Sequence, residues 1–425
     1  MTPYTRRQAL TLAGGAALLS ACTAEAPRAQ PPSADRHVQA PSAAPSASAA
    51  VSRSGRLFAD TAAGLAVADL LTGRVRATYP GAVAEARWAR IYQLDRGRLR
   101  TYQAGDGTLI DDLPAGGGQI KAVSADLVVI GPPPGPRTRT TLTLAGDGRP
   151  RTLRLAGNIE PEAFSPDGAT LYVLDRLPPA APDRYRVRAC DLARGRMTAL
   201  STRDKQQVPP GQEEEMRGQG RQAVLDPVQN ILYTLYTHQD AHLHTRDLAA
   251  GTDLSPGVHA FVHVLHLDQR WAYCLDLPAP FGLGPPEAHT LALAGTSLYV
   301  FDASTGRALL ASTENLTISR SALLGKAPAG EAFAAAGGGH LYVAAGTRLT
   351  VADARTLAPQ AARDLPGPAR GLAHLPGQLL AGAADQVLRL DPATGADLSA
   401  DLSAGLGAVP LPGLRALRHA ETTAG

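Results

Sequence analysis

Short apolar segments recur along the chain from Gly55 onward, and turn-forming residues separate them. The clearest unit spans residues 160–200. It contains a segment ending in the turn sequence SPDG (165–168), followed by TLYVLD, RYRVRACDL and RMTALS. Each segment has the length of a β-strand, and serine, proline, aspartate and glycine stand where hairpins need tight turns. The unit therefore predicts four antiparallel strands.

This unit repeats along the chain. The triplet LYV recurs at Leu298 and Leu341, and an Asp-x-x-x-Gly turn begins at Asp69, Asp191 and Asp391. Taking one residue in the second strand of each unit as a marker gives Leu57, Ile91, Leu127, Leu171, Leu232, Leu298, Leu341 and Leu379. Successive markers lie 34 to 66 residues apart, and four-stranded propeller blades take about 40–50 residues. We expect one all-β propeller over residues 55–418 with eight blades. Seven is the main alternative, because the first and last units are the weakest.

The two ends of the repeat complement each other. The first unit lacks a strand ahead of its marker, and a spare apolar segment, LGAVPLPGLRAL, occupies residues 406–417. Because an unpaired strand edge is a liability, one chain end is expected to supply a strand to the blade begun by the other. We expect residues 419–425 to form a disordered tail.

Composition agrees with this fold and excludes several classes of function. The chain has 425 residues, of which 43 are glycine and 34 are proline. Helix-rich enzymes usually carry fewer of these helix-breaking residues. A net charge of +3 with scattered basic residues does not indicate a nucleic-acid partner. Three cysteines exclude a disulfide scaffold, a zinc ribbon and an iron–sulfur protein.

Residues 1–21 have the features of an export signal. Arg6 and Arg7 precede an apolar run at residues 9–19, which is too short to span a bilayer and has the length of a signal-peptide core. The paired arginines resemble a twin-arginine motif with Ala9 in place of the usual phenylalanine. Export by that route and export by the Sec route both stay open.

The sequence LSAC at residues 19–22 resembles the bacterial lipobox. The resemblance implies that Cys22 is acylated and attaches the mature protein to a membrane. Alanine, proline and serine dominate the rest of residues 22–54, which bury too little surface to fold and are expected to form a disordered tether. We therefore expect a membrane-anchored lipoprotein of the cell envelope, exposed to the periplasm or the extracellular side.

Two stretches carry a resemblance to known propeller families. FSPDGATLYVLD at residues 164–175 and LALAGTSLYVFD at 291–302 resemble the YncE/YVTN (WD40-like) repeats of bacterial envelope proteins, without the Gly-His and Trp-Asp marks of true WD40 repeats. The stretch YTLYTHQDAHLHTRDL from residue 233 resembles a segment of bacterial lipoproteins with no assigned activity. The resemblance implies a β-propeller and leaves the chemistry open, since propellers host enzymes, ligand binders and scaffolds.

Five segments are longer than the blade pattern requires, namely 131–138, 178–184, 201–219, 237–257 and 278–287. Each follows a second strand or joins a fourth strand to the next unit, and loops of those two kinds emerge on the same face of a propeller. Elaborated loops on a rigid scaffold often bind ligands, although neutral drift of loop length explains them equally well. The acidic run at residues 213–215 is most simply a solvated loop edge.

Six of the eleven histidines fall between residues 238 and 266. His238, His242 and His244 could converge on one loop and hold Cu or Zn. Further on, period-two alternation places His259 and His263 on one face of a strand and His266 on the other. The spacing matches no established metal motif. The simpler interpretation is that the loop histidines are ordinary polar residues and that the strand histidines are hydrogen-bonded within the fold.

The other two cysteines, Cys190 and Cys274, fall in a third and a fourth strand of neighbouring units. That placement suits the short Cα separation of a disulfide poorly, so we expect two buried free thiols, with a disulfide as the alternative.

We find no nucleophile elbow, no phosphate-binding loop and no other catalytic constellation in the sequence. The leading hypothesis is a non-enzymatic binding or scaffold module without a cofactor. It would attach to the membrane through Cys22 and bind a protein or small molecule on its elaborated face. One alternative is a lactonase-like propeller hydrolase with polar side chains converging on the central channel. Another is a metal-binding lipoprotein that uses the histidines between His238 and His266.

Overall fold

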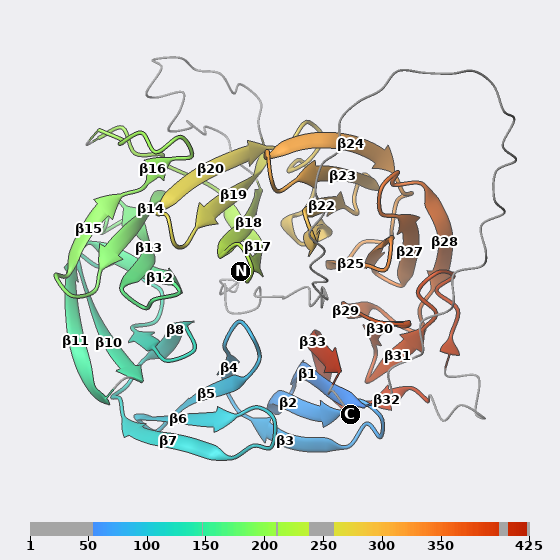
Figure 1. The fold of residues 1–425 in the computed structure, drawn as a ribbon, viewed down its shortest axis with the longest axis horizontal. Coiled ribbons are helices and arrows are strands. Elements are labelled where there is room, and N and C mark those ends of the chain that lie inside the picture. The colour runs from blue at the N-terminus through green and yellow to red at the C-terminus, as the bar shows by residue number, and fades with distance from the viewer. Residues whose placement is uncertain (1–53, 147, 210, 238–258, 399–406, 423–425) are drawn as a thin grey trace, which may run out of the picture.

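The computed structural model describes residues 54–146, 148–209, 211–237, 259–398 and 407–422. They form eight sheets arranged as blades around a central axis, with antiparallel pairing everywhere except between β16 and β20 (Figure 1). The protein is therefore an eight-bladed β-propeller. This confirms the predicted fold class and the predicted count of eight blades rather than seven.

Blades are numbered here in chain order, and the first four contain four strands each. They are blade 1, with β1 (Gly55–Thr61), β2 (Gly64–Asp69), β3 (Val75–Tyr79) and β33 (Leu414–Thr422); blade 2, with β4 (Val83–Ala84), β5 (Arg90–Asp95), β6 (Arg98–Gln103) and β7 (Leu109–Pro114); blade 3, with β8 (Gln119–Val123), β9 (Val128–Gly131), β10 (Arg139–Gly146) and β11 (Gly148–Ala156); and blade 4, with β12 (Asn158–Phe164), β13 (Thr170–Leu177), β14 (Arg184–Asp191) and β15 (Arg196–Ala199).

The second half of the ring follows the same plan, except that blade 5 has a fifth strand. The remaining blades are blade 5, with β16 (Ser201–Thr202), β17 (Gln219–Asp226), β18 (Ile231–Thr237), β19 (Ala260–His266) and β20 (Trp271–Asp276); blade 6, with the short 3₁₀ helix η2 (Pro286–Ala288), β21 (His289–Ala294), β22 (Ser297–Asp302), β23 (Arg307–Ser312) and β24 (Thr317–Leu323); blade 7, with β25 (Ala332–Gly337), β26 (His340–Ala345), β27 (Arg348–Asp353) and β28 (Pro359–Asp364); and blade 8, with β29 (Ala369–Leu375), β30 (Gln378–Ala383), β31 (Gln386–Leu390) and β32 (Val409–Pro410).

The first strand of each blade lies nearest the central axis, and the fourth lies at the rim (Figure 1). From blade 1 to blade 8 the innermost strands are β33, β4, β8, β12, β17, β21, β25 and β29. Second strands are sandwiched between neighbouring blades, so they are buried on both faces. β18 is buried along its whole length, whereas β28 at the rim is mostly exposed.

This double burial explains why the LYV triplets marked the repeat. A strand buried on both faces is apolar at consecutive positions, while a strand with one wet face alternates. Seven of the eight marker residues lie inside second strands, and Leu127 directly precedes β9. The hydrophobic core is correspondingly divided into clusters between adjacent blades. In one of them Tyr172 of blade 4 packs with Phe261 of blade 5.

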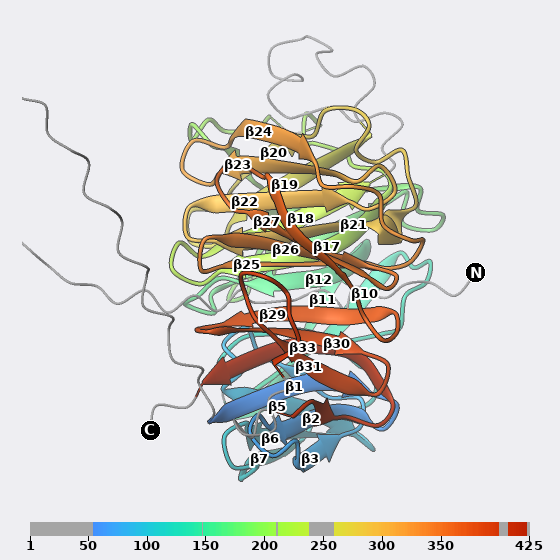
Figure 2. The ribbon, with the colours of Figure 1, turned by 90° about the vertical axis from the view of Figure 1, so that its right-hand side faces the viewer.

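The ring closes in blade 1, where the last strand, β33, pairs with the first, β1 (Figure 2). The expectation that the chain end supplies the missing strand is confirmed. Arg56 stands opposite Glu421 in this pairing, with 2.6 Å between Nε and Oε1.

The predicted boundaries of the closing segment are wrong in detail. Only residues 409–410 of the expected stretch form a strand of blade 8, and the closing strand runs to Thr422, four residues past the expected end of the propeller at 418. Two register shifts interrupt the pairing with β1, and polar residues alternate irregularly with buried ones along β33. Its sequence therefore lacks the two-residue pattern that announces a strand.

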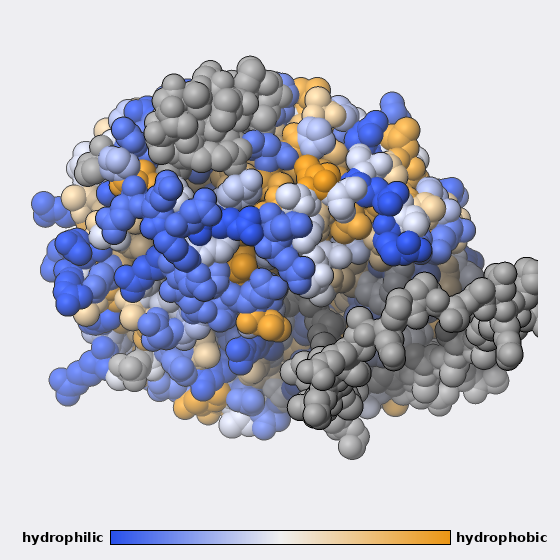
Figure 3. All heavy atoms as spheres, turned by 45° about the horizontal axis from the view of Figure 1, so that its top comes forward, coloured by the Kyte–Doolittle hydropathy of each residue, from blue (hydrophilic) through white to orange (hydrophobic). Residues whose placement is uncertain are grey.

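The surface is predominantly polar. Figure 3 shows a face on which hydrophilic residues prevail and hydrophobic ones occur in small scattered groups. The large apolar side chains that are exposed come from several blades, for example Leu109 in blade 2 and Leu323 in blade 6. Within the described ranges, no helix has the length and apolar character needed to cross a membrane.

Candidate functional site

Three of the long connections lie on one face of the ring. Segments 131–138 and 178–184 join second to third strands, and segment 278–287 joins a fourth strand to the next blade. In a four-stranded antiparallel blade both kinds of connection leave the same edge, which we call the loop face. The segment between β18 and β19 has the same place in the connectivity, although residues 238–258 lie outside the described part of the chain. Segment 201–219 also joins a fourth strand to the next blade, but its first residues bond turns of the opposite edge, at Arg270 and at residues 314–315.

The opposite edge, which we call the short-turn face, is closed by tight turns. In the turn from Asp191 to Gly195 the glycine N–H donates to the aspartate carbonyl oxygen at 2.8 Å, and the turns at Asp69 and Asp391 make the same bond at 3.0 and 2.8 Å. The predicted Asp-x-x-x-Gly motif is thus a turn motif, and glycine suits it because φ at Gly195 is +64°. The expected asymmetry between the two faces agrees with the strand order.

Segment 201–219 crosses the rim from the short-turn face to the loop face. Residues 201–216, which we call the strap, begin with β16, paired in parallel with β20 at the rim of blade 5. Arg203 then donates to the carbonyl oxygens of Glu314 and Asn315 in blade 6, each at 2.8 Å. The strap ends where Met216 and Tyr185 of blade 4 exchange two backbone hydrogen bonds at 2.7 and 2.9 Å. It therefore links three blades along the rim.

A buried ion-pair network fixes the end of the strap. Glu213, only 8% exposed, accepts from Arg186 at 3.2 Å and from Arg188 at 3.1 Å. Asp175 on β13, 7% exposed, accepts from Arg186 Nε at 3.0 Å. The prediction of a solvated loop edge is therefore wrong for Glu213, because two arginines project from the same face of β14 and need a carboxylate. It is adequate for Glu215, which is 41% exposed beside Arg184.

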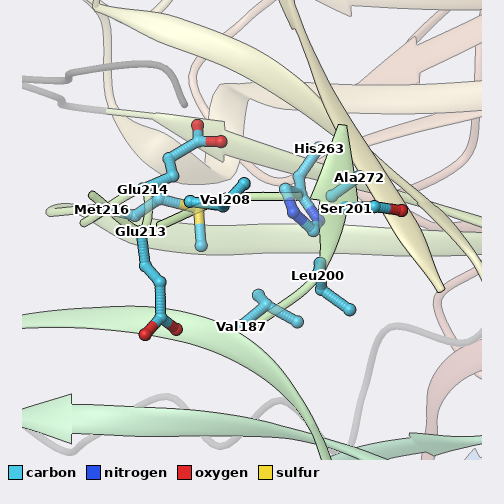
Figure 4. A pocket seen from close by; sticks show the side chains of 9 residues that line it. All are labelled: Val187, Leu200, Ser201, Val208, Glu213, Glu214, Met216, His263 and Ala272. Atoms are coloured by element: carbon cyan, nitrogen blue, oxygen red, sulfur yellow. The ribbon is translucent and has the colours of Figure 1, made fainter. Parts of the chain in front are cut away.

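A small cavity lies behind the strap, between blades 4 and 5 (Figure 4). Its lining residues are Val187, Leu200, Ser201, Val208, Glu213, Glu214, Met216, His263 and Ala272. His263 is buried, and its ring meets the edge of Tyr236 at 6.3 Å. Cys274, which stands opposite His263 in the pairing of β19 with β20, donates its thiol hydrogen to Glu214 Oε1 at 2.7 Å. Among the described residues, no set of three or more His, Cys, Asp or Glu side chains is arranged to hold a metal ion.

Only part of the predicted histidine cluster lies within the described residues. His238, His242 and His244 lie outside the described residues, so the Cu or Zn hypothesis stays a prediction. His263 and His266 lie on opposite faces of β19, as the alternation predicted. His266 packs against Trp271 with ring centroids 5.2 Å apart, and burial lowers its pKa by more than the nearby Asp268 carboxylate raises it.

Cys190 and Cys274 are both buried free thiols, which confirms the preferred prediction over a disulfide. Burial raises the pKa of Cys190 to about 11, so its thiolate is scarce at neutral pH. The predicted lipid attachment residue Cys22 and the export residues Arg6 and Arg7 lie outside the described residues and stay predictions.

The central channel carries charged side chains from the innermost strands. Arg221 of β17 reaches past blade 6 to Glu331, which directly precedes β25, with 2.9 Å between Nη2 and Oε1. Further pairs join Arg418 of β33 to Asp60 of β1, with 2.8 Å between Nε and Oδ2, and Lys121 of β8 to Glu160 of β12, at 2.8 Å. Polar groups converging on the channel are the arrangement that the lactonase-like alternative needs.

Sequence reasoning missed both of these charged groups. The network under the strap had a signal, since arginines at 184, 186 and 188 alternate along a strand and share one face. The three channel pairs gave no signal in the sequence, because they join residues 39, 110 and 358 positions apart.

No family model matches the chain, and no curated protein matches it. Among solved structures, apo AztD from Citrobacter koseri is similar over 88% of this chain and 100% of that chain, with 12% identity and a TM-score of 0.53. BamB from Moraxella catarrhalis is similar over 78% of this chain and 89% of that chain, with 13% identity and a TM-score of 0.44. Dihydro-heme d1 dehydrogenase NirN in complex with DHE covers 83% and 65%, with 12% identity and a TM-score of 0.40.

The likeness to AztD agrees with a propeller fold and carries nothing finer about chemistry. The resemblance to YncE/YVTN repeats stays a prediction.

Proposed function

We propose that this protein is a lipoprotein of the cell envelope whose propeller is a non-enzymatic binding or scaffold module, with its contact surface on the loop face. The observation that carries the proposal is the asymmetry of the ring. Three of the four described long connections leave one face, while tight turns close the other. Elaborated loops on a rigid scaffold are the usual place for recognition.

The direction of the first strand supports this arrangement. β1 is the second strand of blade 1, and second strands end at the loop face, so Gly55 lies at the short-turn face. A tether attached there, from Cys22 to residue 54, would leave the loop face pointing away from the anchor. A flexible chain of that length has an end-to-end distance of about 30 Å, enough to hold the propeller clear of a membrane.

The strap adds rigidity to the proposed surface. Because Glu213 holds Arg186 and Arg188 together below the loop face, the neighbouring connections rest on an ordered support. Preorganised loops lose less conformational entropy when they bind a partner, which favours affinity.

Site-specific photo-crosslinking in a bacterial envelope tests the proposal. A photoreactive residue replaces exposed positions on the loop face (Pro134, Ala181 or Glu287) or matched positions in short turns (Ala193, Arg355 or Thr394) of the full-length protein. We expect discrete adducts from the loop-face positions only. Adducts confined to the short-turn positions would contradict the proposed surface. In the same cells Cys22→Ser should abolish lipid labelling and release the protein from the membrane fraction, and continued membrane attachment would contradict the anchor.

The charged channel favours one second candidate, a lactonase-like hydrolase acting inside the ring. Ion pairs such as Arg221–Glu331 supply polar groups there, but we assign no catalytic residue. Turnover of any member of a lactone panel by the full-length protein, absent from a matched mock purification, would establish this candidate over the scaffold.

A further inference from the structure

Charge is distributed unevenly around the ring. Residues 55–425 contain 36 lysines and arginines and 36 aspartates and glutamates, so this part of the chain is neutral. Blade 3, from Gln119 to Ala156, contains six basic and two acidic residues, a net charge of +4. The rest of residues 55–425 therefore carries a net charge of −4. The ring thus has one positive side, which attracts anions.

Four exposed arginines at the outer edge of blade 3 supply most of this charge (Figure 1). Arg149, Arg151 and Arg154 belong to the rim strand β11, which contains no acidic residue. Each of the other rim strands contains at most one basic residue. Arg139 begins the adjoining strand β10, and it shares a face of the sheet with Arg154, because Thr141 stands opposite Arg154. We call these four arginines the basic rim.

The basic rim has no carboxylate partner within the described ranges, where none of its four arginines forms an ion pair. Arg151 donates to the carbonyl oxygen of Leu192 in blade 4 at 3.2 Å, which leaves its charge uncompensated. Blade 2 differs, since its exposed Arg98 pairs with Asp112 at 2.7 Å. The basic rim can therefore attract an anion from outside the molecule.

The basic rim begins on the same side of the ring as the predicted tether. β11 follows a turn between a third and a fourth strand, and turns of that kind close the short-turn face. Gly55, where the tether would join the propeller, lies at the short-turn face as well. A bilayer within reach of the tether is therefore within reach of the basic rim. Contact through the rim leaves the loop face uncovered.

We propose that the basic rim docks the propeller on a bilayer that contains anionic phospholipids. Guanidinium groups suit this role because their fork matches phosphate oxygens and they stay charged at any physiological pH. None of the exposed large apolar side chains of the described residues belongs to blade 3, so the contact is with headgroups. The presence of the bilayer rests on the proposed anchor, whereas the attraction itself needs no acyl chain.

Co-sedimentation with vesicles tests the basic rim separately from the anchor. The full-length protein is used as its Cys22→Ser variant, which lacks the thiol that acylation needs. The vesicles are phosphatidylcholine with or without phosphatidylglycerol. We expect binding that requires phosphatidylglycerol and weakens as salt is added. Arg149→Gln, Arg151→Gln and Arg154→Gln together should weaken it by roughly a hundredfold, since each arginine contributes about fivefold at an anionic surface.

The matched control combines substitutions at three exposed arginines of blades 6 and 7, namely Arg320→Gln, Arg355→Gln and Arg363→Gln. It changes the net charge equally and should leave binding nearly unchanged. Thermal unfolding verifies that each variant is folded. Equal weakening by the two triple variants would overturn the proposal, and so would equal binding to both kinds of vesicle or the absence of binding. Because no acyl chain is present, failure of the anchor would instead appear in the lipid labelling of the unsubstituted protein.

Discussion

Glu213 and Glu215 stand two positions apart in the strap, yet one is 8% exposed and the other 41%. Glu213 faces two arginines on β14, while Glu215 meets Arg184 in contact with water. Burial decides how much each carboxylate contributes. Removing one partner of a buried pair leaves an uncompensated charge, whereas an exposed pair contributes little.

Glu213→Ala should therefore destabilise the propeller by about 2–3 kcal/mol. This is somewhat below the ~3–5 kcal/mol typical of a fully buried pair, because each arginine side chain keeps 20% exposure. The free energy of unfolding in urea, followed by circular dichroism, measures the change. Glu215→Ala is the matched control and should cost under about 1 kcal/mol. Equal effects of the two substitutions would show that the buried network does not support the strap.

Single residues were predicted from the sequence only where local pattern determines environment. The two free thiols and the opposite orientations of His263 and His266 followed from strand position alone. The environment of Glu213 did not, because its partners lie 25 and 27 positions earlier in the sequence, on a strand of blade 4. The channel ion pair Arg221–Glu331 was out of reach for the same reason, since its members come from blades 5 and 7.

At the scale of elements, the closing strand β33 is the most consequential. It is an innermost strand, it lines the channel, and it covers an edge of β1 that would otherwise be open. Its pairing places Arg56 directly opposite Glu421, with side chains 19% and 26% exposed. Opposite charges facing each other across a strand pair stabilise it, and like charges weaken it.

Arg56→Glu should lower the free energy of unfolding by about 1–2 kcal/mol, because it places two carboxylates opposite each other in the pairing of β1 with β33. Glu421→Arg alone should act similarly, and the double charge exchange should recover most of the loss. Thermal and urea unfolding of the four proteins measure these values. If the loss of unfolding free energy in the double variant equalled the sum of the two single losses, the Arg56–Glu421 contact would not stabilise the pairing of β1 with β33.

Second strands were predictable because burial on both faces leaves an uninterrupted apolar run, as in β13 and β18. The two-residue strands β4, β16 and β32 leave no such run. Their positions follow from which strand they pair with: β16 comes directly after the last strand of blade 4 in the sequence, yet it pairs with β20 of blade 5. Pairing across the chain, rather than local sequence, determines these elements.

For the whole molecule, closure makes the ring a single unit in which each blade packs against two others. Hydrophobic clusters join blade 4 to blade 5 and blade 8 to blade 1 in the same way. With no open end, local opening of one blade must expose the faces of both neighbours. We expect the propeller to unfold in one cooperative transition.

The buried thiols report on this transition. In the Cys22→Ser variant only Cys190 and Cys274 remain, and a pKa of about 11 leaves Cys190 about 0.1% thiolate at pH 8. Neither should react with Ellman's reagent until the ring opens. The urea midpoint for thiol reactivity should then match the midpoint by circular dichroism. Reactivity at lower urea would show that blades 4 and 5 open separately, and an absence of thiols after unfolding would reveal a disulfide.

The pairing of β1 with β33 also has a consequence for biosynthesis. Gly55, in the first described strand, stands opposite Thr422 in the last. The first of these strands to be made therefore waits for the last, and blade 1 keeps an unpaired inner edge until β33 has been synthesised. Blades 2 to 8 can form in order of appearance, but the ring cannot close before β33 has emerged. An exposed strand edge over that interval is a site for mispairing, and pairing with β33 removes it.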